Sequence, residues 1–183
     1  MRAGSTDVFE SLPDIPRLFT ALAEWGAALV YVFVVARSAS SNALNPHAAV
    51  PRWRLATAAI GGLVVLIGAQ ELLGRAPLPL WVPGMMSAYA LVWCVIRVGT
   101  ALDWRWVTHM SARAFIVAEL AASLAWQVVV YSHADKPFWH PASLFGYAAI
   151  SATCLAVVYY CERRVCRQGA LPVLRFADLA SCV

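Results

Sequence analysis

Five polar side chains that could do chemistry lie inside or at the ends of long apolar runs of this sequence. They are three carboxylic acids and two amides: Glu24, Gln70, Glu71, Glu119 and Gln127. A carboxyl group at membrane depth is costly, and such a residue is by default a candidate functional residue. The sequence has no Gly-rich phosphate loop, nucleophile elbow, HExxH motif or zinc-ligand cluster. Binding and helix pairing are therefore the expected roles, and no catalytic residue is assigned.

The composition is that of an integral membrane protein. Of the 183 residues, 61% are apolar and 13% are charged, whereas a soluble domain carries about 25% charged residues. Basic residues outnumber acidic ones by 14 to 10, but they form no basic stripe interleaved with aromatic residues. Binding of nucleic acid is therefore not expected, and the lipid bilayer is the expected surrounding.

The apolar runs predict an all-α fold, a polytopic membrane helical bundle of about five transmembrane helices. Each run is long enough to cross a bilayer. The first begins where Asp14 and Pro16 can start a helix. The five expected spans cover residues 16–36, 55–73, 80–97, 114–131 and 142–161.

The distribution of Lys and Arg predicts the orientation. Basic residues are concentrated in the expected loops 37–54 and 97–113 and in the segment after residue 161. These regions are expected on the cytoplasmic side, with the N-terminus outside. The domain organisation predicted is an extracytoplasmic segment (1–15), a five-helix transmembrane domain (16–161) and a basic cytoplasmic tail (162–183).

Depths estimated from the helical rise place several of the polar groups in the outer half of the bilayer. Glu24, Gln70, Glu71 and Gln127 could converge there and line an outward-facing ligand pocket. They could equally be interhelical contacts that satisfy each other inside the bundle. Glu119 is expected nearer the inner side, where an ion pair with Arg97 would be structural.

No cofactor or metal is expected. The spacing of His133, Asp135 and His140 matches no standard zinc pattern. No histidine lies within an expected span, as an intramembrane haem would need. The five cysteines form no C-x-x-C pair, so small-residue packing is the role expected for them.

Three stretches resemble a known family: Asp14-Ile-Pro-Arg-Leu-Phe-Thr-Ala-Leu-Ala-Glu-Trp25, Trp81-Val-Pro-Gly-Met85, and the run Ala112–Gln127. Together they are similar to the N-terminal transmembrane region of bacterial sensor histidine kinases with a GHKL-type ATPase domain. The resemblance implies a sensory module of a two-component system in the bacterial cytoplasmic membrane. Its implied partners are a secreted peptide or small-molecule signal, and a second copy of the chain or a separate kinase.

The sequence departs from that family because it has no candidate phospho-accepting histidine region and no ATP-binding motif. The chain is therefore not expected to phosphorylate anything by itself, and it is expected to be a truncated or stand-alone sensor. A small membrane transporter, or the substrate-binding subunit of one, is the alternative. It is suggested by Glu24, Glu119 and a weak internal echo between residues 17–24 and 113–119, as in an inverted repeat.

Overall fold

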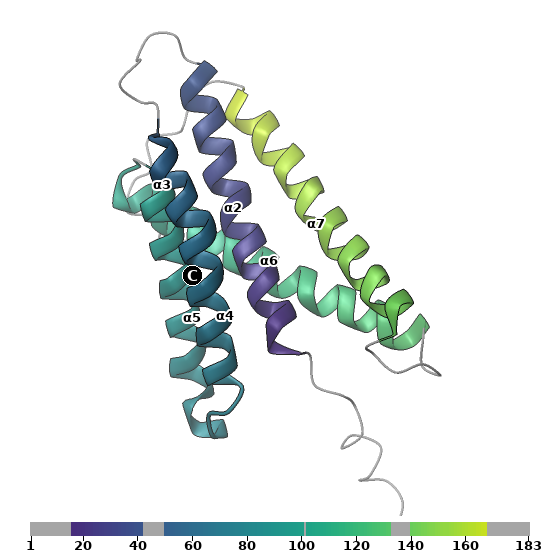
Figure 1. Cartoon of the computed structure of the whole chain (residues 1–183). Helices are drawn as coiled ribbons and strands as arrows, with labels where there is room; N and C mark the ends of the chain where they lie inside the picture. The colour runs from purple at the N-terminus through teal and green to yellow at the C-terminus, as the bar shows by residue number, and fades with distance from the viewer. Residues whose placement is uncertain (1–15, 42–49, 101, 133–139, 168–183) are drawn as a thin grey trace, which may run out of the picture.

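The protein is all-helical over the residues that the computed structural model describes, which are 16–41, 50–100, 102–132 and 140–167 (Figure 1). No strand occurs among them, as the sequence predicted. The elements in chain order are α2 (Arg17–Ser41), α3 (Arg52–Ala56), the π-helical turn η2 (Thr57–Gly61), α4 (Gly62–Leu73), the 3₁₀ turn η3 (Leu78–Leu80), α5 (Trp81–Gly99), α6 (Trp104–Ser132) and α7 (Pro141–Arg167).

Five helices are long and apolar enough to cross a membrane, which confirms the expected number. They cover Arg17–Arg37, Arg52–Leu73, Trp81–Gly99, Trp104–Ser132 and Pro141–Arg164. The second of these is one continuous rod made of α3, η2 and α4. Pro83 lies in the first turn of α5, where its missing N–H breaks no helical hydrogen bond.

Helices α2, α6 and α7 extend furthest beyond their expected bounds, and α2 continues to Ser41 instead of ending near residue 36. Helix α6 begins at Trp104 instead of near residue 114, because Val107, Met110 and Ser111 continue its buried stripe towards the N-terminus. As a result His109, expected in a loop, lies within α6. Helix α7 continues to Arg167 and so takes up the start of the expected tail. The expected segment 1–15 and residues 168–183 lie outside the described residues.

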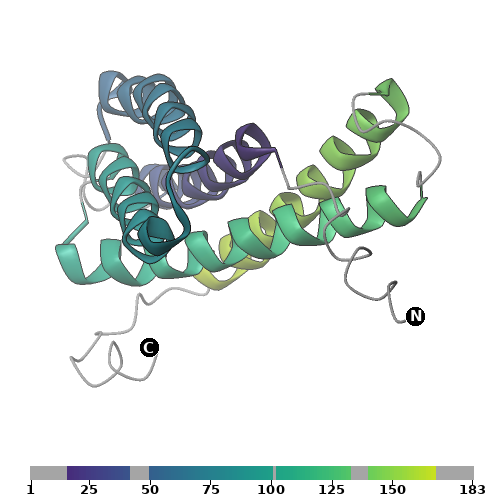
Figure 2. The ribbon, with the colours of Figure 1, turned by 90° about the horizontal axis from the view of Figure 1, so that it is seen from below.

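Helix α2 is the central element of the bundle, because α4, α5, α6 and α7 all contact it. The long helices run in alternating directions, so the start of α2 and the end of α7 lie at opposite ends of the bundle (Figure 1). Helices α2, α4 and α5 form one group of rods, and α6 crosses this group obliquely, whereas α7 packs against α2 and α6 (Figure 2). Most of α2 is therefore covered by other helices, while Leu22 and Phe33 remain exposed on it.

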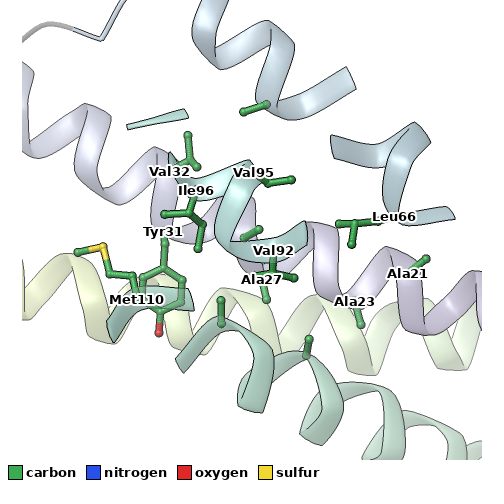
Figure 3. Packing of buried hydrophobic residues seen from close by; sticks show 14 of the residues in the cluster. Ala21, Ala23, Ala27, Tyr31, Val32, Leu66, Val92, Val95, Ile96 and Met110 are labelled. Carbon is green, nitrogen blue, oxygen red and sulfur yellow. The ribbon is translucent and has the colours of Figure 1, made fainter. Parts of the chain in front are cut away.

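Small residues let α2 and α6 approach closely. The buried alanines of α2 are 21, 23, 27 and 28, and α6 buries alanines 114, 118, 121, 122 and 125. Apolar side chains gain little by leaving lipid for protein, so close backbone packing of small residues is a main source of helix association in membranes. Larger side chains fill the other contacts of α2: Val32 and Ile96 pack together, and Tyr31 lies beside Met110 (Figure 3).

The close approach of α4 and α5 makes a prediction at Gly62. A Cβ atom there would lie 2.8 Å from Cγ2 of Val95, a β-branched side chain with little rotamer freedom in a helix. Gly62→Ala is therefore expected to lower the free energy of unfolding by about 1–3 kcal/mol, the usual cost of overpacking. Thermal unfolding in detergent micelles measures this change.

Gly68 of the same helix provides the matched control, since a Cβ there would meet nothing within 4 Å. Gly68→Ala is expected to leave stability unchanged or to raise it by about 0.5–1 kcal/mol, because alanine is the better helix former. Equal effects of the two substitutions would contradict the close contact at Gly62.

Candidate functional site

One buried hydrogen bond joins α2 to α4 through the carboxyl and amide groups expected at membrane depth. Nε2 of Gln70 donates to Oε1 of Glu24 at 2.8 Å, and the two residues are only 2% and 0% exposed. Gln70 faces inward because it continues the buried stripe of α4, four residues after Leu66. The other carboxyl oxygen of Glu24, Oε2, is buried and has no hydrogen-bond partner in the part of the chain that the structure describes. The carboxyl group of Glu24 is therefore satisfied on one side only.

The residue next to Glu24 ties α2 to the same rod at a second point. Nε1 of Trp25 donates to the backbone oxygen of Ala59 at 2.7 Å. Ala59 lies in the π-helical turn η2, and such turns frequently occur at functional sites in helices. Glu24 and Trp25 thus attach one level of α2 to two positions on the rod, Gln70 and Ala59, which are roughly 16 Å apart along it.

Glu119 brings a second carboxyl group to this region from α6. It interacts electrostatically with Glu24 and with Arg17. Its Oε1 atom is buried without a hydrogen-bond partner. Arg17 lies over the end of α4, where a Cβ added to Gly74 would come within 2.9 Å of its Cγ. Arg17, Glu24, Gln70 and Glu119 are called the Glu24 cluster below.

Two of the four expected pocket residues lie outside this cluster. Glu71 follows Gln70 on the chain and is exposed on the outer side of α4. Gln127 is exposed on α6, because the buried stripe of that helix passes through Ala125 and Val129 instead. The structure therefore brings Glu24 and Gln70 together, and it does not bring Glu71 or Gln127 to them.

The expected ion pair between Arg97 and Glu119 is not formed. Arg97 is exposed near the end of α5, and its backbone oxygen accepts a hydrogen bond from Nη2 of Arg54 at 3.3 Å. Because α6 begins earlier than expected, Glu119 lies about 22 Å along the helix from Trp104. This position takes it away from the arginine-rich end of the bundle and towards Arg17.

A second polar cluster, not anticipated from the sequence, joins α2, α6 and α7. Glu162 of α7 forms an ion pair with Arg113 of α6. The hydroxyl of Tyr31 on α2 donates to Oε1 of the same carboxylate at 3.3 Å. Nearby, Nη1 of Arg37 donates to the hydroxyl of Tyr159 at 3.0 Å. Glu162 was assigned to the tail, but its buried position within α7 makes it part of the bundle.

The described residues contain no group of three or more His, Cys, Asp or Glu side chains that could hold a metal ion. His140 is exposed just before α7. His133 and Asp135, which the sequence analysis considered with it, lie outside the described residues.

Comparison with known proteins adds no identification. No protein-family model matches this chain, and neither a curated protein nor a solved structure matches it. The two polar clusters are therefore the features from which a function can be inferred.

The hydrogen bond between Glu24 and Gln70 predicts that the effect of substituting one of them on the free energy of unfolding depends on which residue stands at the other position. Gln70→Leu removes the partner of a buried carboxyl group, so it is expected to lower the free energy of unfolding by about 1–3 kcal/mol. Adding Glu24→Leu to it is expected to recover much of this loss, because neither polar group is then left alone. Unfolding of Gln70→Leu, Glu24→Leu, the double variant and the wild type in mixed micelles measures the coupling.

Gln127→Leu is the matched control, since it makes the same exchange at an exposed position. It is expected to change stability by less than about 0.5 kcal/mol. A loss as large as that of Gln70→Leu would show that the cost comes from removing any glutamine and not from the buried contact.

Proposed function

We propose that this chain is a membrane-embedded sensory module of a histidine-kinase-type signalling system, in a bacterial cytoplasmic membrane with the N-terminus outside. The single observation that carries the proposal is the pair of polar clusters on one helix. Glu24 and Tyr31 lie on α2, about 10 Å apart along its axis. A change at the Glu24 cluster would thus reach α7 through one rigid helix and the contact of Tyr31 with Glu162.

The packing of α7 supports a moving role for this helix. The apolar segment of α7 is much less buried than that of α2. Near its start, Tyr147 of α7 packs against Phe19 of α2, with 4.6 Å between the ring centroids. Near its other end, Glu162 and Tyr159 make polar contacts with α2 and α6. A shift of α2 would therefore be passed to α7 at both ends, and a signalling partner would receive that change.

The proposed orientation agrees with the positions of the arginines. Because successive long helices run in opposite directions, the ends of α2, α5 and α7 and the start of α3 lie at the same end of the bundle (Figure 1). These helix ends carry Arg37, Arg97, Arg163 and Arg52. Basic residues favour the cytoplasmic side of a membrane. The Glu24 cluster then lies in the outer half, where a secreted peptide or small molecule would act. A second copy of the chain or a separate kinase is the proposed partner inside.

The test follows the distance between α5 and α7 in lipid nanodiscs. Spin labels are attached to the exposed Cys94 and Cys161, with the other cysteines replaced by serine. Peptide and small-molecule fractions from the medium of the producing cells are expected to change the distance distribution. Glu162→Gln is expected to abolish the change while binding persists, because it removes the ion pair with Arg113.

Arg164→Gln is the matched control, since Arg164 is exposed on the same helix. It is expected to leave the distance change intact. A full response in Glu162→Gln would contradict the relay through Tyr31 and Glu162.

A transporter, or a substrate-binding subunit of one, is the second candidate, favoured by the two buried carboxyl oxygens at Glu24 and Glu119. Solute or proton flux in proteoliposomes distinguishes the two functions. Flux that depends on the same ligand, and that Glu24→Gln abolishes, would replace the sensory proposal with transport.

A further inference from the structure

We propose that Glu24 is a proton-binding site, which holds a proton on Oε2 within the closed bundle and exchanges it reversibly. This goes beyond the sensory role, since the site would bind its proton whether the bundle senses or transports. The assignment rests on burial, on the partner of each carboxyl oxygen, and on the charges that surround the group.

Among the described residues, no cationic side chain is paired with Glu24. By contrast, Glu162 forms an ion pair with Arg113, and Glu119 interacts electrostatically with Arg17. Glu24 is 0% exposed, and among the described residues its hydrogen-bond partner is the neutral amide of Gln70. A buried carboxylate without a positive partner is far more costly than a buried carboxylic acid.

The two carboxyl oxygens of Glu24 fit the two halves of a carboxylic acid. Oε1 accepts a hydrogen bond from Gln70, as a carbonyl oxygen does. Oε2 is buried and has no hydrogen-bond partner among the described residues, so a neutral hydroxyl at this position costs much less than an ionised oxygen would. Oε2 is therefore the place for the proton.

The groups that face Glu24 from the neighbouring helices favour a neutral side chain. Glu119 of α6 brings a negative charge, which repels a second one. Tyr147 of α7 interacts electrostatically with Glu119. Its phenol group carries no positive charge, so it does not favour an ionised Glu24. From α4 comes Gln70, and the described residues of α5 that pack in this core are apolar, including Val92.

The closeness of the packing indicates a proton and not a larger ligand. Glu24 is fully buried on α2 about one helical turn from the buried Ala21 and Ala28, and α6 and α4 bury Ala122 and Leu66 in the same core. A proton adds no volume to this core. Its loss would place a second negative charge beside Glu119 and weaken the junction of α2 and α6, the contact on which the bundle is centred.

Infrared spectroscopy of the full chain in lipid nanodiscs tests the site at neutral pH, where exposed carboxyl groups are ionised. The wild type is expected to show the C=O stretch of a protonated carboxyl group. Glu24→Gln is expected to remove this band. Glu119→Gln is expected to keep it, because Glu24 still has no positive partner, and Glu71→Gln, which changes the exposed neighbour of Gln70, is expected to keep it as well.

A second readout does not depend on comparing variants. The infrared band of the wild type is followed as the pH is raised, and it is expected to weaken as the reversibly bound proton is released, whereas exposed carboxyl groups are already ionised at neutral pH. Absence of the band in the wild type, its loss in Glu119→Gln, or a band that does not change with pH would overturn the proposal. These measurements need neither a signalling molecule nor a transported solute. A negative result would therefore argue against the proton site without deciding whether the chain is a sensor.

Discussion

The structure depends on a constraint that lipid imposes: a polar group inside the bundle needs a partner from the protein itself. Glu24 meets this requirement on one oxygen only, through Gln70. This hydrogen bond and the one from Trp25 to Ala59 both face the second span, so they define the side of α2 that meets it. Buried alanines of α2 and α6 allow those two helices to approach closely, and polar pairing and small-residue packing thus act together at the centre of the bundle.

The two polar clusters divide the bundle into two junctions of different character. At the Glu24 cluster a buried carboxyl group has an amide partner and lies near another carboxyl group. At Glu162 the carboxylate has an arginine and a tyrosine hydroxyl. A fully paired cluster fixes geometry, whereas a partly satisfied one leaves a cost that a change of state can relieve. The proposals for sensing and for proton binding both use this difference.

The helices could be predicted from sequence, but the directions in which their side chains point could not. Apolar runs of membrane length identify a helix whatever surrounds it, so all five were found. In lipid, however, both the outward and the inward faces are apolar, and hydrophobic patterning does not say which way Gln127 points. The buried alanine stripe of α6 carries that information, and Gln127 lies off it. The early start of α6 had the further effect of placing Glu119 away from Arg97.

Helix α6 has 29 residues and is about 43 Å long. The hydrocarbon core of a bilayer is about 30 Å thick. A rod longer than the layer that contains it is accommodated by tilting, and its tilt then varies with the thickness of that layer. Its oblique course across α2, α4 and α5 shows such a tilt relative to its neighbours (Figure 2). Since α6 bears both Glu119 and Arg113, a change in the tilt of this one helix would alter the geometry of both polar junctions together, so in a bilayer the thickness of the lipid layer would act on both.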